Sequence, residues 1–543
     1  MWLRIGLVVL PTVYTIYSLI QWRIVANRQM KLLKALNPDM PVVAYLFPRI
    51  LFNVMDVTRI GIIPDRFMPL PSTWLWTGKY NTFAQLGCDT ISVVGPDIRR
   101  NLGQPMLIYN VVTTEHAEWR RHRKIVAPQF SERNNMCVHR QTVRTVHDMF
   151  RSWQTGIHGA TANTEHELHI NVSEDMAKLA LYVISGAGFG MRLDWDTSNT
   201  DTVLEHGHSM SFKSAIQGVI NGLQSKIILP KLAYALPIPS VQRLKLVFDE
   251  FEQYSSEMIR DADTQTDDNL LVSLTKASRA DTDIGGGLTE RELIGNIFIF
   301  MFAGHETTAV TLIYALAMLA AHPATQQRMY EEITLVLKGG DPEYKHIHEM
   351  AYTLAVMNET LRLFPPVIGI PKYVTNQQTL GKYTIPENTN INLHVSGLHY
   401  NPAYWGPDPT VFRPERWFSS PNCAKHATKT SEFFRDSAKS RTQSGQSAFS
   451  MHSTDHEGVS PNDGATSSST LQPHLSIFSY NRFAFIPFSE GPRSCIGKRF
   501  AQVEFITTLA LIVQKYTIHY LMVYVSRIWW IALIKSLFIL RKM

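Results

Sequence analysis

The sequence is poor in cysteine, with four in 543 residues, at Cys88, Cys137, Cys423 and Cys495. They are widely separated, which excludes the close pairs of a zinc site and the density of a disulfide-rich secreted domain. The chain has no dense run of lysine or arginine, and its net charge of +6 is mild for this length, so a nucleic-acid-binding protein is not expected. It also shows no solenoid-type repeat and no glycine-rich dinucleotide loop. A protein facing a reducing compartment is the simplest interpretation.

One long apolar stretch is present, from Ile5 to Trp22. Its roughly 18 residues would form a helix of about 27 Å, which barely spans a bilayer. One basic residue precedes the stretch, four follow it within a short distance, and no small-residue cleavage site is present. We expect residues 1–28 to be an uncleaved membrane anchor with the rest of the chain in the cytosol. A buried core helix is the alternative.

The remaining chain reads as one large domain. Residues 29–60 contain three prolines and suit a semi-rigid neck that can touch lipid. Apolar residues at helical spacing dominate residues 61–516, whereas strand signals are confined to Thr90–Val94 and the region Tyr373–Leu393. We therefore expect a mainly α domain with a minor β-sheet.

Residues 419–473 differ in composition from the rest of this domain. They are rich in Ser, Thr, Asn, Asp and Gly and contain few large apolar side chains. Such a segment cannot bury enough apolar surface to order itself. We predict a disordered surface insertion within the domain.

The most specific motif is the segment from Phe488 to Gly497, which has the form F-x-x-G-x-R-x-C-x-G. A cysteine that binds iron must be a thiolate, which favours a tight loop whose backbone N–H groups point at the sulfur. Gly491 and Gly497 permit such a loop because glycine adopts positive φ and allows close approach to a flat ring. The helix expected to follow places its positive end near Cys495. A buried structural cysteine is the alternative.

This segment resembles the proximal haem loop of the cytochrome P450 family, and three further segments resemble that family in the expected order. The resemblance implies the cytochrome P450 fold, with haem b (iron protoporphyrin IX) between a long oxygen-binding helix and the helix after the cysteine loop. It implies that Cys495 is the iron ligand and that Arg493 pairs with a haem propionate. Phe488 and Gly497 complete the haem-binding loop.

The second segment, Phe302–Thr308, lies in a helix predicted to begin with a capping box at Thr289 and Glu292 and to end near His322. Gly304 in its interior costs about 1 kcal/mol relative to alanine, and a flat macrocycle passing close by is one reason for it. The Thr307 hydroxyl can bond back to the carbonyl of Ala303 and open a groove for dioxygen.

For this second segment, resemblance to the family assigns Glu306 and Thr307 as the acid–alcohol pair that delivers protons to dioxygen. It places Ala303 and Gly304 beside the haem. A polar patch on a long core helix is the alternative.

The other two segments supply a structural cluster and further haem contacts. Glu359 and Arg362 share one helical face at a spacing of three residues. In the family this pair is buried and joined by a third residue, here Arg416. In the fourth segment, Trp119 and Arg123 share a helical face four residues apart, and the resemblance makes them donors to the haem propionates.

The resemblance implies a separate NADPH-cytochrome P450 reductase and a lipophilic small-molecule substrate. Basic residues near the cysteine loop are expected to form the reductase-binding surface, with ordinary solvated charges as the alternative: Arg120, Arg121, Lys124, Lys498 and Arg499. Apolar residues are expected to line the substrate pocket, with the core as the alternative: Leu107 to Val111, Phe298, Phe302, Ala303 and Val367 to Ile370.

Two regions depart from the family. The stretch between Val94 and Trp119 is too short for the strand, helix and substrate-contacting loop that the family normally has there. Residues 517–543 form an atypical apolar tail instead of the β-rich segment that usually ends the family. This tail is expected to be either a second membrane contact or translated non-coding sequence.

We therefore expect a monooxygenase that hydroxylates a lipophilic substrate at the endoplasmic reticulum membrane, in secondary metabolism. The alternatives are a catalytically impaired haem-binding membrane protein, because of the two departures, and a membrane-tethered helical scaffold without haem.

Overall fold

The computed structural model describes most of the region that carries the motifs. The described residues are 109–418, except 156–160, 165–166, 192, 194, 196–206, 230, 263–268, 281–285, and then 482–542, except 529–530. Parts of 24–44 and residues 92–94 are also described. The apolar stretch from Ile5 to Trp22 and the predicted insertion 419–473 lie outside these residues, so both remain predictions.

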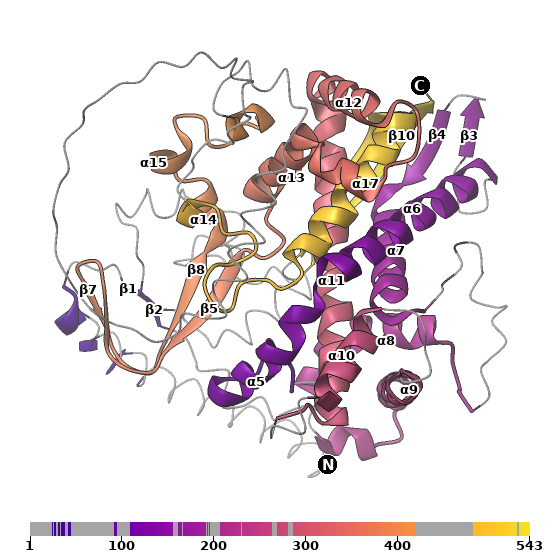
Figure 1. Ribbon diagram of the computed structural model, residues 1–543. Helices are drawn as coiled ribbons and strands as arrows, with labels where there is room; N and C mark the ends of the chain where they lie inside the picture. Colours follow the sequence, from indigo (N-terminus) through magenta and orange to yellow (C-terminus); the bar gives the residue numbers. More distant parts are fainter. Residues whose placement is uncertain are drawn as a thin grey trace, which may run out of the picture.

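Helices make up most of the described chain, which confirms the mainly α expectation (Figure 1). The principal helices are α5 (His116–Val126), α6 (Glu132–Thr155), α7 (Val172–Val183), α8 (Phe212–Ile228), α9 (Pro239–Asp261), α10 (Leu270–Ala280), α11 (Glu290–Ala321), α12 (Pro323–Leu337), α13 (Ala351–Leu363) and α17 (Lys498–Lys515). Shorter elements are α14 (Val395–His399), α15 (Pro402–Trp405), the π-turn η5 (Ile184–Gly188) and the 3-10 turns η4 (Ala127–Gln129), η6 (Lys231–Ala235), η8 (Tyr344–His348), η9 (Pro414–Trp417) and η11 (Arg482–Ala484).

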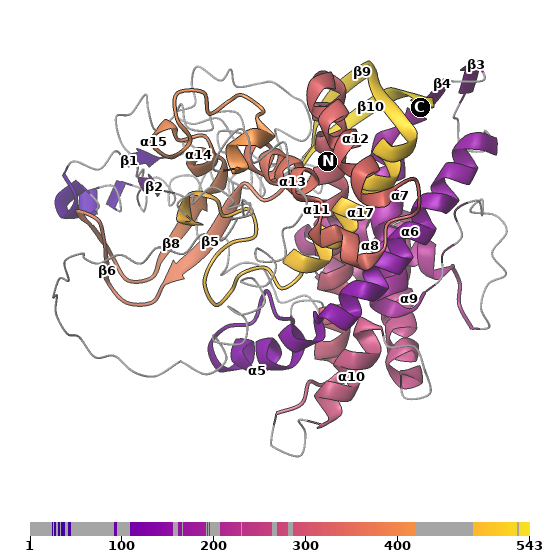
Figure 2. The same ribbon diagram turned by 45° about the horizontal axis from the view of Figure 1, so that its top comes forward.

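The longest of these helices, α11, crosses the middle of the domain, with α7, α13 and α17 packed against it (Figures 1 and 2). The predicted capping box is present: the Thr289 hydroxyl accepts from the backbone of Glu292, whose carboxylate accepts from the backbone of Thr289. Within the described chain, α11 is the one helix long and apolar enough to cross a membrane. Most of that apolar stretch is buried inside the domain, so α11 is a core helix.

Four small sheets accompany the helices in the described residues. Two-stranded pairs are formed by β1 (Val42–Ala44) with β2 (Ser92–Val94), β5 (Gly369–Val374) with β8 (Thr389–His394), and β6 (Gln378–Leu380) with β7 (Tyr383–Ile385). The largest sheet has the order β3 (Thr161–Thr164), β4 (Glu167–Asn171), β10 (Ile531–Lys542), β9 (Tyr516–Ile528). The strands expected near Val94 and between Tyr373 and Leu393 are therefore present.

The C-terminal tail forms a long hairpin of β9 and β10 within that largest sheet, and β10 pairs with β4. Ile518 and Leu540 lie opposite each other and are both buried. The expectation that a β-rich C-terminal segment is missing was wrong. The tail is rich in β-branched and aromatic residues, which favour strands, and its overall apolar character concealed that preference.

The neck touches the domain at Asn37, which is buried although it belongs to the segment predicted as a semi-rigid linker. Its side-chain amide donates to the carbonyl of Thr384 at 2.9 Å and accepts from the backbone N–H of the same residue at 2.9 Å. This pair of bonds fastens the chain before the first strand to β7.

Candidate active site

The loop that carries Cys495 connects η11 to α17 and turns through two residues of positive φ, Ser489 and Gly491. The backbone N–H of Cys495 donates to the carbonyl of Phe488 at 2.8 Å, which closes the loop. The Cys495 side chain is exposed, and α17 begins three residues after it. The alternative of a buried structural cysteine is thus excluded, and the helix N-terminus lies close to the sulfur in sequence, as expected.

The two glycines of the loop play different parts. Gly491 has a φ of +83°, as predicted, and a side chain there would be strained. Gly497 has a φ of −86°, so the positive φ expected for it was wrong. A Cβ at Gly497 would lie 4.0 Å from Cys495 Sγ, which is ordinary contact. The second residue of positive φ is Ser489, which the glycine pattern did not reveal.

The structure brings Trp119 and Arg123 of α5 to this loop. Arg123 Nη1 donates to the carbonyl of Ser494 at 2.9 Å. The guanidinium of Arg493 lies over the Trp119 ring, 4.6 Å from its centroid. Arg493 Nη2 also donates to the carbonyl of Thr114 at 2.8 Å. The residues predicted from the α5 motif and from the cysteine-loop motif therefore form one cluster.

The middle of α11 presents an accessible stripe in an otherwise buried helix. Ala303 is exposed, and Phe302, Glu306 and Thr307 are half-buried, whereas residues on either side of the stripe are buried. Thr307 Oγ1 donates to the carbonyl of Ala303 at 2.7 Å, as predicted. Burial raises the pKa of Glu306, so its carboxyl holds a proton more readily than a solvated one. A carboxyl group with a raised pKa and a hydroxyl thus lie next to each other on the accessible face.

Gly304 faces a neighbour that the sequence did not suggest. A Cβ placed on it would lie 3.5 Å from the side chain of Ile184, in the π-turn η5. That is ordinary contact, so alanine would fit sterically at this position. The contact with Ile184 therefore does not require glycine at this position, and the approach of a flat ring to Gly304 stays a prediction.

The predicted structural cluster is present, and its central pair of Glu359 and Arg362 is fully buried. Glu359 and Arg362 are both 0% exposed, and Arg362 donates two hydrogen bonds to Glu359, at 2.8 and 3.0 Å. Arg416 Nε donates to Glu359 Oε1 at 2.8 Å, and Trp417 Nε1 donates to Oε2 at 3.1 Å. Every charge in the cluster is paired, which is the condition for a buried ion pair to be tolerated.

His399 connects this cluster to the cysteine loop, which the sequence motifs did not indicate. Its carbonyl accepts from Arg362 Nη1 at 2.9 Å, and its Nε2 accepts from the backbone N–H of Ile486 at 3.0 Å. Burial and the nearby Arg362 lower the pKa of His399 to about 3, so the ring is neutral and can accept. His399 lies outside the motifs found in the sequence, so no sequence pattern indicated this role.

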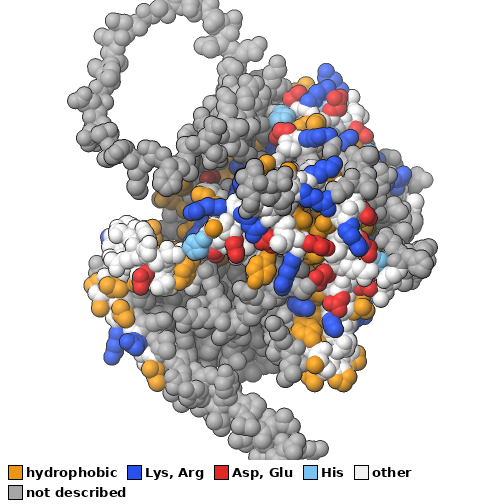
Figure 3. All heavy atoms as spheres, turned by 60° about the horizontal axis from the view of Figure 1, so that its bottom comes forward, with side chains coloured by type: hydrophobic (Ala, Val, Ile, Leu, Met, Phe, Trp, Pro, Cys, Tyr) orange, Lys and Arg blue, Asp and Glu red, His pale blue; other side chains and the backbone are white. Residues whose placement is uncertain are grey.

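The predicted basic surface is narrower than expected. Arg121 donates to the carbonyl of Gly287 and to Glu292, and Arg499 is buried beside Glu132 and His348. These two arginines hold helices together and are not part of an open surface. Arg120 and Lys124 are exposed and Lys498 is half-buried. Basic and acidic side chains are interspersed over the described part of the face drawn in Figure 3.

The residues predicted to line a pocket divide into two groups. Val111 and Phe298 are buried, so the core alternative is correct for them. Phe302 stacks on Phe298 with ring centroids 5.9 Å apart and reaches the accessible stripe. Val367 is exposed and Ile370 is half-buried, consistent with an apolar wall. Leu107 lies outside the described residues.

The donor set suits a haem with one thiolate ligand. The described residues contain no group of three or more His, Cys, Asp or Glu side chains able to hold a bare metal ion. The exposed thiol of Cys495 lies instead in a loop closed by its own N–H, beside an indole and two guanidinium groups that match a cofactor with carboxylate substituents. The accessible stripe of α11 offers a small residue, Ala303, which allows a flat ring to approach. These features define a haem-thiolate protein.

Comparison with known proteins agrees with a haem-thiolate protein. The family model described as "Cytochrome P450" matches residues 75–434 and 471–524, and the unmatched stretch between them lies within the predicted insertion. Cytochrome P450 monooxygenase 124 of Postia placenta is 34% identical over 424 residues, covering 75% of this chain and 68% of the relative. Cytochrome P450 monooxygenase AOL_s00215g278 of Arthrobotrys oligospora is 28% identical with the same two coverages. The chain belongs to the cytochrome P450 family, whose members are oxidoreductases that incorporate oxygen from dioxygen.

A third relative is informative for its architecture. The bifunctional cytochrome P450/NADPH–P450 reductase 2 of Bacillus subtilis is 29% identical over 325 residues. The match covers 58% of this chain but only 29% of that protein. Its name describes a P450 and a reductase in one polypeptide.

Proposed function

We propose that this protein inserts one oxygen atom into a lipophilic substrate, giving an alcohol, with electrons from NADPH supplied by a separate reductase. The observation that carries the proposal is the pairing of Glu306 with the Thr307–Ala303 hydrogen bond on the accessible stripe of α11. A reaction that cleaves the O–O bond of dioxygen and releases water consumes two protons. Isomerisation and dehydration involve no proton delivery to dioxygen, so this pair favours monooxygenation.

The cofactor is proposed to be haem b, iron protoporphyrin IX. When bound, it supplies the iron at which dioxygen is reduced. Cys495 would bind its iron, and the positive end of α17 would favour the thiolate form of this side chain. The propionate donors would be Trp119, Arg123 and Arg493, and the residues nearest the ring would be Ala303, Gly304, Phe488 and Gly497.

Proton delivery is the part of the reaction that this chain's own residues perform. Burial raises the pKa of Glu306, so its carboxyl holds a proton more readily than a solvated carboxyl does. The hydroxyl of Thr307, turned toward the Ala303 carbonyl, weakens the helix locally and leaves room for water beside it. Phe302 and Val367 supply apolar surface that favours a lipophilic substrate and limits bulk water.

The reductase, the membrane and the pathway are further parts of the proposal. A separate reductase is proposed as the electron donor, whereas the name of the Bacillus relative describes the P450 and the reductase in one polypeptide. Arg120, Lys124 and Lys498 are proposed to bind its acidic surface. The apolar N-terminal stretch supports anchoring in the endoplasmic reticulum membrane, and the fungal monooxygenase relatives support a role in secondary metabolism.

The alternative of a catalytically impaired haem-binding protein was based on the short region before Trp119 and on the atypical C-terminal tail. The hairpin of β9 and β10 pairs with β4, so the tail does contain β-structure, which supports the proposed function over this alternative. The short region before Trp119 is the ground that remains.

The test is a carbon-monoxide difference spectrum of the reduced protein, compared between wild type and Cys495→Ala. A strongly red-shifted Soret band that depends on Cys495 is expected. Identical, unshifted spectra would exclude a thiolate ligand and with it the proposed function.

A further inference from the structure

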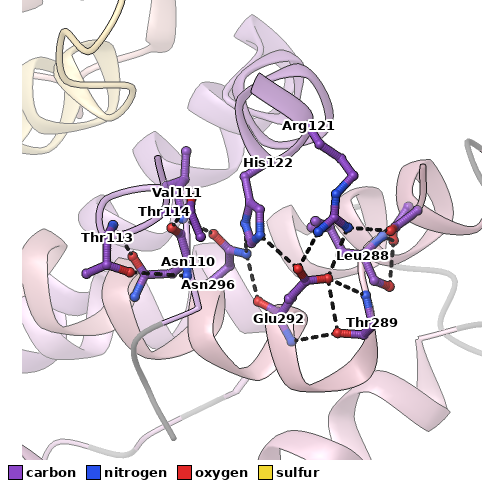
Figure 4. Close-up of polar contacts among 12 residues, drawn as sticks. Asn110, Val111, Thr113, Thr114, Arg121, His122, Leu288, Thr289, Glu292 and Asn296 are labelled. Atoms are coloured by element: carbon purple, nitrogen blue, oxygen red, sulfur yellow. Dashed lines mark hydrogen bonds and ion pairs between the residues drawn. The ribbon is translucent and has the colours of Figure 1, made fainter. Parts of the chain in front are cut away.

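A buried polar contact joins α5, the turn before it and the N-terminal part of α11 (Figure 4). At its centre is Asn296, which is 0% exposed. Its Nδ2 donates to the carbonyl of Glu292 at 2.7 Å and to Nδ1 of His122 at 3.0 Å, and its Oδ1 accepts from the backbone N–H of Val111 at 3.0 Å. Both N–H groups of this amide and one of the two acceptor positions of its oxygen are therefore used.

These bonds fix both the amide orientation of Asn296 and the tautomer of His122. The Val111 N–H requires an oxygen opposite it, and the Glu292 carbonyl requires an N–H, so the amide cannot be reversed. His122 Nδ1 must then accept, and its Nε2–H donates to Glu292 Oε1 at 3.3 Å. Burial lowers the pKa of His122, consistent with a neutral ring. The contact thus has one direction of donation, from Asn296 through His122 to Glu292.

Glu292 is the fixed end of this contact. Although burial opposes its charge, the hydrogen bonds from Arg121 and Thr289 bring the pKa of Glu292 down to about 2. It is therefore a permanent acceptor for His122 at neutral pH.

The turn held by Asn296 is rigid and lies very close to α11. A Cβ at Gly295 would lie 2.4 Å from the carbonyl oxygen of Tyr109, so only glycine allows this approach. The Asn110 side chain accepts from the N–H groups of Val112 and Thr113, at 2.9 and 3.2 Å. Asn110 is 1% exposed. These hydrogen bonds therefore hold the turn and Val111 together.

Arg493 of the cysteine loop binds to the same turn. Arg493 Nη2 donates to the carbonyl of Thr114 at 2.8 Å and pairs with Glu115 at 2.7 Å, and Nη1 donates to the carbonyl of Val112 at 3.4 Å. Arg493 is two residues before Cys495. A continuous set of contacts thus runs from Asn296 in α11, through the turn 110–114, to the loop of the exposed thiol.

We propose that Asn296 and His122 are positioning residues for the haem edge: they fix the turn 110–114, whose carbonyls hold the Arg493 guanidinium in place. This rests on the proposed function, because Arg493 is taken there to bind a haem propionate. The two residues act through Arg493 and do not themselves touch the cofactor.

The experiment measures the rate at which the loaded protein transfers haem to an excess of a haem-scavenging globin. Asn296→Leu keeps the size of the side chain and removes all three bonds. It is expected to speed haem loss by about tenfold, as for changes in groups that orient a cofactor's direct partners. Asn296→Ala, which leaves room for a water to replace part of the bonding, is expected to give a smaller increase and is used if Asn296→Leu does not fold.

Two controls separate positioning from general loosening. Arg121→Gln removes an ion pair from the same contact between α5 and α11 without touching Asn296, and it should lower the melting temperature with an unchanged haem-loss rate. In an Arg493→Lys background, which speeds haem loss on its own, Asn296→Leu should add nothing further, because its effect passes through the guanidinium.

The proposal is overturned if Asn296→Leu loses haem at the wild-type rate, if Arg121→Gln matches it, or if its effect is undiminished in the Arg493→Lys background. A wild-type protein without a thiolate-type Soret band would instead defeat the proposed function. In that case, amide hydrogen exchange at residues 111–114 of the haem-free protein tests the contact alone. Protection should fall in Asn296→Leu and persist in Arg121→Gln, and equal protection in all three proteins rejects the contact's role.

Discussion

The Nε2 atom of His399 accepts a hydrogen bond from the backbone N–H of Ile486 at 3.0 Å, and this bond joins the buried Glu359–Arg362 cluster to the start of the cysteine loop. A neutral imidazole is the only form of His399 that can make this bond, because protonation would place two donors face to face. The bond therefore makes the loop sensitive to acid at a site remote from the sulfur.

The pH dependence of stability follows from His399. Its pKa falls from 6.5 in the unfolded chain to about 3 in the fold, so the unfolded state binds more protons between these values and stability declines as pH falls from about 6.5 toward 3. Replacing it by Gln retains an acceptor and removes the titration, so His399→Gln should lose less stability over this window. Denaturant unfolding at several pH values measures the difference. Equal slopes for both proteins would show that other groups dominate.

Loss of the acceptor itself is tested by His399→Phe at pH 7. The Ile486 N–H would be left buried without a partner, which costs about 1–3 kcal/mol. The unfolding free energy of His399→Phe should fall by this amount relative to His399→Gln.

Removal of the charge at Glu359 should be severe. Glu359→Gln would leave Arg362 buried without a counter-charge, and breaking such a pair costs about 3–5 kcal/mol. Urea unfolding measures the lost free energy of unfolding. If the Glu359→Gln protein cannot be expressed in folded form, that outcome also agrees with the prediction. Glu343→Gln is the matched control, because Glu343 pairs with Lys345 where both side chains are exposed. The free energy of unfolding of the Glu343→Gln protein should equal that of the wild type. Similar effects of the two substitutions would contradict the burial argument.

Two neighbouring threonines allow a test of proton delivery. Thr307 and Thr308 make the same bond to the carbonyl four residues earlier, but Thr307 lies on the accessible stripe and Thr308 is buried. Thr307→Ala should reduce product formed per NADPH by on the order of tenfold or more and increase hydrogen peroxide. Thr308→Ala should leave this ratio unchanged. If both substitutions alter the ratio equally, the stripe does not identify the functional hydroxyl.

The reductase surface is tested through Arg120. Because Arg120 is exposed on α5, Arg120→Glu should raise the KM for the reductase several-fold at low salt, and the effect should shrink as ionic strength rises. Arg243→Glu, at an exposed position of α9, is the control of equal charge change. A KM that responds alike to both substitutions would indicate a general effect of net charge.

The sequence predicted those parts of the site in which residue type and spacing carry the chemistry. The loop of Cys495, the bond from Thr307 to Ala303 and the pair of Glu359 and Arg362 all follow from short motifs. Each depends on contacts within a helix turn or on a loop whose shape Gly491 permits. Arg416 reaches Glu359 from 57 residues away, and it was predicted from the family resemblance.

The contacts that were missed connect residues far apart in the chain. His122 meets Asn296 from 174 residues away, and His399 meets Ile486 from 87 residues away. No local pattern reports such pairs, because a buried histidine has the same local signature whether it accepts from a distant amide or only fills space. The same limit explains Arg121 and Arg499, whose partners lie on other helices.

The placement of β10 between β4 and β9 has a consequence for biosynthesis. Leu540 lies opposite Leu168, so β4 obtains this neighbour only when nearly the whole chain has been translated. Until then this edge of β4 is unpaired, and the sheet that packs beside the earlier helices stays incomplete. A nascent chain that stalls or terminates before this strand is thus expected to be a substrate for chaperones and degradation, however complete its haem-binding motifs are.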